Sequence, residues 1–267
     1  MKNITVFSGF NKPLGNKSLR EFLREVKNGR YRAEVKKIRS LIRNGEEEEA
    51  QRLKKLLASV TICALYIGGR RDVNLTQYCG MVVLDIDDLS PGEVIRLRAM
   101  IEADNHTYAC FVSPGGLGLK LLVRVSRKDN SLPDKLEDIK SLHKEMYNRV
   151  MRYYTVMTGA TIDVSGKDVG RLCYVSYDPL LFLNETAEVF VPDDALPSNS
   201  VAKKAVKNAC GEENSVEEIF SKCVRYTTKK QSYKEGNRNV FINLLANNCN
   251  RRGLAKEDTE QIGRAHV

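Results

Sequence analysis

Two aspartates separated by one residue are the side chains in this sequence best suited to chemistry. Asp85 and Asp87 close the apolar segment at 82–87. Side chains alternate between the two faces of a strand, so both carboxylates would point the same way. Adjacent carboxylates repel each other unless a cation lies between them, and their hard oxygens suit Mg²⁺ or Mn²⁺. The pattern fits a metal site, or alternatively an ordinary polar strand end.

A third carboxylate, Asp163, follows an apolar residue shortly before another strand-like segment. Three carboxylates are the usual minimum for a two-metal phosphoryl-transfer site, in which paired cations stabilise the attacking and leaving oxygens. Arg171, further along the chain, could place its guanidinium on a phosphate. Taken alone, Asp163 also fits a solvent-exposed loop, and Arg171 a surface ion pair.

A glycine-rich segment at 113–120, Ser-Pro-Gly-Gly-Leu-Gly-Leu-Lys, joins two strand-like segments. Its glycines are Gly115, Gly116 and Gly118. Backbone N–H groups exposed by these glycines, together with Lys120, would hold a triphosphate. A glycine-rich β-hairpin is the alternative. The segment is not a Walker A loop, because Leu119 separates Gly118 from Lys120.

The elements that must position these residues follow one another in the order of a ferredoxin-like or RRM-like βαββαβ core. The sequence predicts strands at 81–87, 107–113, 118–126 and 171–177, with helices at 91–103 and 133–157. Ser90 and Glu93 predict a capping box, with Pro91 at the first helical position. In this topology the first and third strands are neighbours, so their residues can face one site.

The segment before this core predicts helices. Apolar residues recur at helical spacing within 19–26 and 35–42. A third helix at 46–57 begins with acidic residues and ends with basic ones, as the helix dipole favours. A strand at 60–67 and a basic turn at 68–71 follow. We therefore expect an α+β fold whose core carries an N-terminal helical extension.

The segment after the core predicts a linker and a small helical domain. Residues 192–215 have the turn-forming, polar composition of a linker. Helices are predicted at 216–227 and 239–252, with Gly253 as a C-terminal stop. The small helical domain would then occupy 216–261.

The composition excludes several classes of protein. With 267 residues, 42% of them hydrophobic, the chain can bury a core and form one full domain and a smaller one. It has no apolar run of membrane-spanning length and no signal peptide, so we expect no membrane partner and a cytoplasmic location. Seven cysteines without a CxxC spacing favour buried thiols over disulfides or zinc. Three histidines, none beside a nucleophile, argue against a Ser-His-Asp or Cys-His enzyme.

The net charge of +9 is unevenly distributed. Residues 1–60 carry 15 basic and 7 acidic side chains, 61–200 carry 15 and 19, and 201–267 carry 13 and 8. Basic ends suit a polyanionic partner, although a solvated basic helix face is the alternative.

Taken together, Asp85-x-Asp87, the loop at 113–120, and Asp163 followed by Arg171 resemble the three ordered motifs of the archaeo-eukaryotic primase (primase-polymerase) superfamily, whose core is RRM-like. A closer similarity is to the VirE N-terminal domain family of mobile-element proteins. The blocks at 60–71, 79–87, 113–120 and 171–179 carry this resemblance. It covers residues 1–191, with the RRM-like core at about 60–191.

The resemblance implies that Asp85, Asp87 and Asp163 bind two Mg²⁺ or Mn²⁺ ions and that Lys120 binds the phosphates of an NTP or dNTP. The nucleotide-binding residues it implies are Ser113, Gly115, Gly116, Gly118, Lys120 and Arg171, with Ser113 and Gly116 shaping the loop. The basic residues expected to contact nucleic acid are Arg70, Arg71 and Arg124. Many primase-polymerases have His in place of Lys120, a departure that leaves polymerase competence open.

The expected function is a metal-dependent nucleotidyltransferase that makes primers or extends DNA on a single-stranded template, for a mobile element or a plasmid or phage replication system. The alternatives are a non-catalytic nucleic-acid-binding replication module and a two-metal nuclease.

Residues 235–254 are similar to the small helical domain that follows primase cores and commonly leads into a helicase, which would be a further partner. Residues 262–267 resemble a translated sequencing adapter. We therefore expect a truncated reading frame, and a native protein that continues past Glu260.

Overall fold

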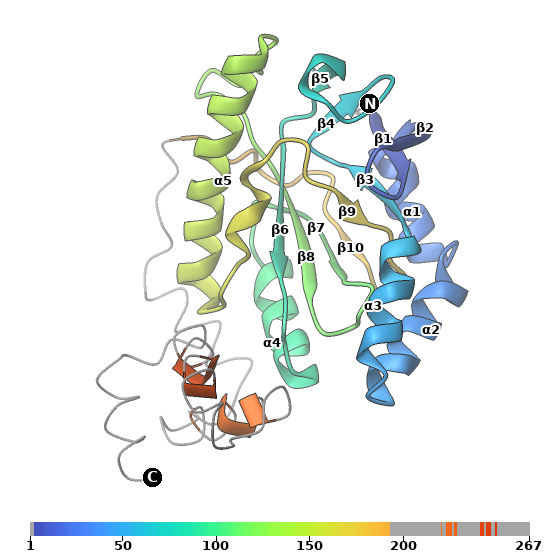
Figure 1. Ribbon diagram of the computed structural model, residues 1–267. Coiled ribbons are helices and arrows are strands. Elements are labelled where there is room, and N and C mark those ends of the chain that lie inside the picture. The colour runs from blue at the N-terminus through green and yellow to red at the C-terminus, as the bar shows by residue number, and fades with distance from the viewer. Residues whose placement is uncertain are drawn as a thin grey trace.

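The computed structural model describes residues 3–192 and, further along the chain, residues 220, 223–225, 227–228, 241–242, 244–246 and 249. The described chain has an α+β fold, in which two four-stranded antiparallel sheets are accompanied by a two-stranded one and by helices (Figure 1). Among the described residues, no helix has the length and apolar character needed to cross a bilayer.

The first sheet joins the start of the chain to the segment around residue 173. Its strand order is β2-β1-β3-β9, formed by β1 (Asn3–Ser8), β2 (Lys12–Ser18), β3 (Ala58–Thr61) and β9 (Cys173–Tyr174). A small separate sheet pairs β4 (Ala64–Tyr66) with β5 (Leu75–Tyr78). The hairpin of β1 and β2 therefore precedes the predicted helical extension, and the predicted strand at 60–67 is divided between β3 and β4.

The second sheet carries the aspartate pair. Its order is β10-β7-β8-β6, formed by β6 (Met81–Ile86), β7 (Thr107–Val112), β8 (Leu119–Arg124) and β10 (Phe182–Leu183). The predicted neighbourhood of the first and third core strands is confirmed, because β6 pairs with β8 in an antiparallel register that sets Asp85 opposite Lys120. The strands β6, β7 and β8 lie close to the predicted strands at 81–87, 107–113 and 118–126.

The prediction of a fourth core strand at 171–177 is wrong in length and in partner. The strand formed there, β9, has only two residues and pairs with β3 of the first sheet. The chain reaches the edge of β6 earlier, where the Asp163 N–H donates to the Asp85 carbonyl at 3.0 Å. It then turns away through the short 3₁₀ helix η2 (Val164–Lys167).

Two helices cover one face of the second sheet, and a third helix contacts its strand β7. On one face α4 (Pro91–Glu102) and α5 (Leu136–Thr158) pack against β6, β7 and β8 (Figure 1). The predicted capping box of α4 is confirmed, with Ser90 and Glu93 exchanging hydrogen bonds. The N-terminal helices are α1 (Leu19–Asn28), α2 (Arg32–Arg43) and α3 (Glu47–Leu56), and a 3₁₀ helix η1 (Asp72–Asn74) precedes β5. Phe22 of α1 meets Phe111 of β7 edge to face, with ring centroids 6.2 Å apart.

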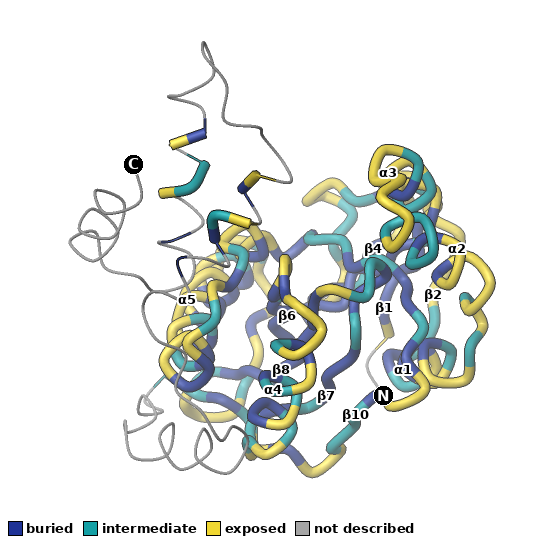
Figure 2. The backbone as a smooth tube through the Cα atoms, turned by 90° about the horizontal axis from the view of Figure 1, so that it is seen from below, coloured by how far each residue is buried: buried dark blue, intermediate teal, exposed yellow. Residues whose placement is uncertain are grey.

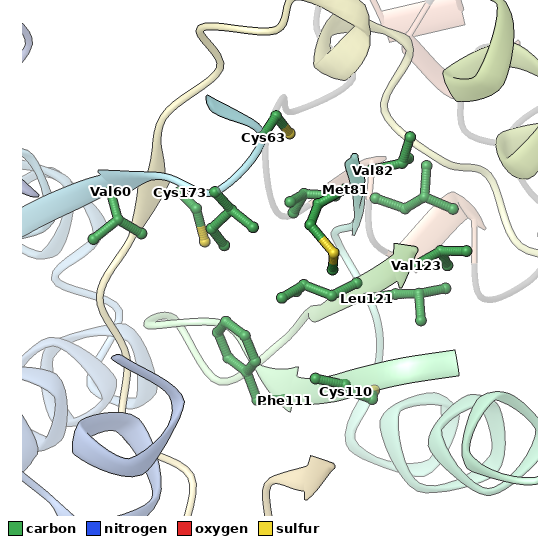
Figure 3. Packing of buried hydrophobic residues seen from close by; sticks show 14 of the residues in the cluster. Val60, Cys63, Met81, Val82, Cys110, Phe111, Leu121, Val123 and Cys173 are labelled. Atoms are coloured by element: carbon green, nitrogen blue, oxygen red, sulfur yellow. The ribbon is translucent and has the colours of Figure 1, made fainter. Parts of the chain in front are cut away.

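One apolar cluster contains buried residues from both four-stranded sheets. Figure 3 shows Val60 and Cys173 from the first sheet in the same cluster as Met81, Cys110 and Phe111 from the second. In Figure 2 the strands are mostly buried, whereas helix surfaces such as that of α3 are exposed. The predicted burial of the cysteines is confirmed for the six that the structure describes.

Predictions for the C-terminal part fall mostly outside the described residues. This holds for the linker at 192–215 apart from Pro192, for most of the helical domain at 216–261, and for all of 262–267. The described residues beyond 192 are helical. Among them, Phe220, Cys223 and Cys249 pack into a small apolar cluster.

Candidate active site

The pairing of β6 with β8 creates a buried ion pair. Lys120 Nζ donates a hydrogen bond to Asp85 Oδ1, and the side chains of Lys120 and Asp85 are only 9% and 15% exposed. Burial acts to lower the pKa of Lys120, but the charge of Asp85 and its hydrogen bond outweigh burial and raise that pKa. Lys120 therefore stays protonated, with its charge held against the end of β6.

The second aspartate lies against the glycine-rich loop. Asp87 follows the last residue of β6, and a Cβ built on Gly118 would lie 2.9 Å from Asp87 Oδ1 and 3.1 Å from Ser113 Oγ. The Asp87 side chain reaches solvent, but partial burial of its carboxyl raises its pKa. The nearby charges act in both directions: Lys120 lowers this pKa and Asp85 raises it. The structure therefore brings Ser113, Gly118 and both aspartates to one end of the sheet.

The third aspartate is joined through its main chain to the first. The Asp163 N–H bonds to the Asp85 carbonyl, while the Asp163 carboxylate accepts from the Ser165 N–H at 2.9 Å and from the Arg171 guanidinium at 2.9 Å. Burial acts to raise the pKa of Asp163, but the hydrogen bonds from Ser165 and the charges of Arg171 and Lys120 lower it. Asp163 is therefore ionised at neutral pH.

Helix α5 supports the segment that carries Asp163, and sequence reasoning missed this. The Tyr147 hydroxyl donates to the Asp163 carbonyl. A Cβ on Gly166 would lie 2.7 Å from the Tyr147 hydroxyl oxygen, so the ring packs directly on η2. Tyr147 occupies one of many apolar positions on a long helix, and its sequence context gives no sign of this contact.

The loop between β7 and β8 is a hydrogen-bonded hairpin turn, as the alternative interpretation predicted. The Gly116 N–H donates to the Ser113 carbonyl at 3.0 Å, and the Ser113 N–H donates to the Gly118 carbonyl at 2.8 Å. Gly116 has φ +83°, a conformation that a residue with a side chain rarely adopts. Ser113 and Gly116 therefore shape the loop, and the Gly116 N–H is used within the turn.

Arg39 of α2 is a contact of this loop that sequence reasoning missed. Its guanidinium donates to the carbonyls of Ser113 at 2.9 Å, Pro114 at 3.3 Å and Tyr177 at 3.0 Å. Arg39 is one of many basic residues in the N-terminal helices, so no local signal distinguishes it. A further basic residue, Lys54 of α3, is close enough to lower the pKa of Asp87.

The basic residues expected to contact nucleic acid lie in different places. Arg70 donates to the carbonyls of Phe10 at 3.1 Å and Gly170 at 2.9 Å, so it ties a turn to the main chain next to Arg171. Arg71 is exposed. Arg124 pairs with Met81 at the other end of the β6–β8 ladder, 5.7 Å from the centroid of the Tyr108 ring. Arg124 is therefore separated from the aspartates.

The donor set of the site consists of carboxylates, which are ligands that Mg²⁺ and Mn²⁺ prefer. Over the described parts of the chain, no group of three Asp, Glu, His or Cys side chains is arranged around one point for a metal ion. Two of the three carboxylates instead contact basic side chains, Asp85 with Lys120 and Asp163 with Arg171. Cation binding would require Lys120 to move away from Asp85.

Of the comparisons with known proteins, only the one with family models found a match, and that match covers part of the chain. A search of curated proteins and a search of solved structures gave no significant match. Residues 52–182 match the family model described as BT4734-like, N-terminal domain, a family related to VirE-like primase domains. The matched segment contains all three aspartates, the loop, Lys120 and Arg171, and it leaves β1, β2, α1 and α2 outside.

Proposed function

We propose that this chain is a primase-polymerase-like nucleotidyltransferase that uses Mg²⁺ or Mn²⁺ and an NTP or dNTP on a single-stranded DNA template. The observation that carries the proposal is the position of Asp85, its partner Lys120 and Asp87 at one end of the β6–β8 pair, where the main chain of Asp163 is bonded to Asp85. The family match supports it, because the matched family is related to VirE-like primase domains.

The buried pair of Asp85 and Lys120 favours a functional role over a structural one. Removing two opposite charges from water costs about as much as their attraction returns, so such a pair adds little net stability. It lies next to two further carboxylates, in a position where an apolar pair would satisfy the fold equally well. Because Asp85 already binds the positive charge of Lys120, a divalent metal ion could take the place of the lysine ammonium group there.

In phosphoryl transfer the acidic residues would bind metal ions and the basic residues would bind the nucleotide phosphates. Asp85, Asp87 and Asp163 would supply oxygen ligands to divalent cations, which stabilise the attacking and leaving oxygens of the reaction. Lys120, released from Asp85, and Arg171, released from Asp163, would bind phosphate oxygens of the nucleotide. Each basic side chain would then exchange a carboxylate partner for a phosphate partner, so the charges in the site remain balanced.

The test is incorporation of labelled NTPs and dNTPs by the purified chain, with Mn²⁺ or Mg²⁺ and single-stranded DNA. Asp85→Asn removes the charge next to Lys120, and we expect it to lower incorporation by about 100-fold or more, because a metal ligand is lost. Asp72→Asn is the matched control, since Asp72 also pairs with a lysine, Lys140, but does so on the surface. It should retain the activity of the unmodified protein.

Three results would contradict the proposal. Absence of incorporation by the unmodified chain on every template would refute nucleotidyl transfer. Cation-dependent cleavage of labelled DNA without added nucleotides would identify a nuclease instead. Salt-dependent DNA binding that is indifferent to divalent cations and to Asp87→Asn, again without incorporation, would identify a non-catalytic binding module.

A further inference from the structure

We propose that Arg39 of α2 is a positioning residue that aims the Gly115 N–H of the β7–β8 loop at a phosphate of the bound nucleotide. The inference rests on the proposed function, and it extends the site to a helix outside the segment 52–182 that matches the family model.

The first step is the contact between α2 and the loop. The Arg39 guanidinium bonds the carbonyls of Ser113 and Pro114, two consecutive residues at the start of the loop. A Cβ on Gly116 would lie 3.3 Å from Arg39 Nε, and one on Gly115 would lie 3.4 Å from Ile42 Cδ1. One side of the loop is therefore covered by α2, and its carbonyls on that side are bound by Arg39.

The second step follows from peptide geometry. No peptide bond among the described residues is cis, and in a trans peptide the C=O and the following N–H point in opposite directions. The Pro114 carbonyl points at Arg39, so the Gly115 N–H of the same peptide points away from α2. Pro114 has no N–H, and the Gly116 N–H is bonded to the Ser113 carbonyl. Gly115 thus supplies the N–H that this part of the loop directs outward.

The third step links this peptide to the aspartates. The Ser113 N–H bonds the Gly118 carbonyl, so the two ends of the loop move together. Gly118 in turn lies against the Asp87 carboxylate. Arg39 also bonds the Tyr177 carbonyl, in a segment whose Asp178 carboxylate accepts from the Val112 N–H at the end of β7. The guanidinium therefore fixes the loop on the side opposite the N–H groups that an anion would meet.

The experiment compares substitutions on one helix in the full chain. Arg39→Gln removes the guanidinium, and Arg39→Lys keeps the positive charge without the planar fork. Arg43→Gln is the matched control, because it removes the same charge from the exposed end of α2. Binding of ATP and of dATP with Mg²⁺ is measured by equilibrium dialysis, and incorporation kinetics are measured alongside. Thermal unfolding of each variant reports on folding.

For Arg39→Gln we expect the nucleotide Kd and KM to rise about tenfold. This is the effect of losing one hydrogen bond to a charged group, here the bond from the Gly115 N–H to the phosphate. We expect kcat to stay within about threefold, because the reacting groups themselves are unchanged. Arg39→Lys should recover part of the loss, and Arg43→Gln should bind like the unmodified protein. Equal effects of Arg39→Gln and Arg43→Gln would overturn the inference, as would a fall in kcat without a change in Kd or KM.

Folding and function can be separated in the same experiment. If both Arg39 variants fail to fold, Arg39 is a structural residue and the inference is wrong. If the unmodified chain binds nucleotide without incorporating it, the proposed function fails while the Kd values still decide the role of Arg39. If the unmodified chain binds neither ATP nor dATP, both proposals are refuted.

Discussion

Two glycines of the same loop should respond in opposite ways to substitution by alanine. At Gly118 the added Cβ would lie 2.7 Å from the Ile86 carbonyl oxygen and 2.9 Å from Asp87 Oδ1. The Ile86 carbonyl belongs to the main chain of β6 and cannot rotate out of the way. Gly118→Ala must therefore push apart β8 and the end of β6, where the aspartates are.

Gly115 supplies the matched control. The nearest atom to a Cβ there is Ile42 Cδ1 at 3.4 Å, the mobile end of a side chain. Neither Gly115 nor Gly118 has a positive φ, so alanine can adopt both backbone conformations without strain. The two substitutions add the same atom to the same loop, and for the stability of the folded protein they differ in the space available to that atom.

The expected magnitudes follow from this difference in space. Forcing one carbon into a packed position costs about 1–3 kcal/mol, and the contact with main-chain oxygen favours the upper part of that range for Gly118→Ala. Gly115→Ala should change the free energy of unfolding by less than about 1 kcal/mol, with a gain from restricting the unfolded chain.

Urea denaturation of the full chain, followed by circular dichroism, measures the free energy of unfolding for both variants. Nucleotide incorporation is the second measurement, because displacement of Asp87 should lower the activity of Gly118→Ala below that of the unmodified protein. If Gly118→Ala is as stable as Gly115→Ala and as active as the unmodified protein, the close packing of the loop against β6 is wrong.

Two further predictions concern stability alone. Asp178→Ala should lower the free energy of unfolding by about 1.5–3 kcal/mol, because the buried Asp178 carboxylate accepts from the Val112 N–H and from Arg98, which keeps only Glu102 as its carboxylate partner. Urea denaturation measures this loss, and a loss below about 1 kcal/mol, the value of an exposed pair, would contradict it. Burial lowers the pKa of His143 from its usual 6.5 to about 4, so the unfolded chain binds the proton more tightly. Stability should therefore fall by about 3 kcal/mol as the pH drops from about 6.5 to 4, and thermal unfolding of His143→Phe should show a flatter pH dependence over that window than the unmodified chain.

Much of the second sheet could be predicted because its signals are local. The continuous apolar run of β6, the capping box of α4 and the apolar periodicity of α5 each lie within a short stretch of sequence. The order of the elements predicted that the strands carrying Asp85 and Lys120 are neighbours, and the observed register sets these two residues opposite each other.

The first sheet could not be predicted in the same way. The strand β2 is exposed along nearly its whole length, so it has no apolar alternation to reveal it. The pairing of β9 with β3 joins residues more than a hundred positions apart, and its two residues are too short for a periodic signal. Long-range pairing of this kind is decided by packing rather than by local pattern.

The same distinction between local and long-range signals applies to the residues of the candidate site. The proximity of Asp85, Asp87 and Lys120 could be predicted because each lies on, or directly after, one of two paired strands whose order was recognised. Arg39 and Tyr147 could not, because each acts on main-chain carbonyls that the sequence does not place beside it. No pattern of residue spacing in the sequence identifies a side chain that binds a carbonyl far along the chain.

The pairing of β3 with β9 has a consequence for the biosynthesis of the chain. The first sheet combines residues 58–61 with residues 173–174, so β3 keeps an unpaired edge until the ribosome has released the segment around residue 174. Until then the nascent N-terminal hairpin and helices have no complete sheet to pack on, and contacts of such large sequence separation form slowly. A polypeptide released before that point would expose β3 to pairing with other chains, and so would be prone to aggregate.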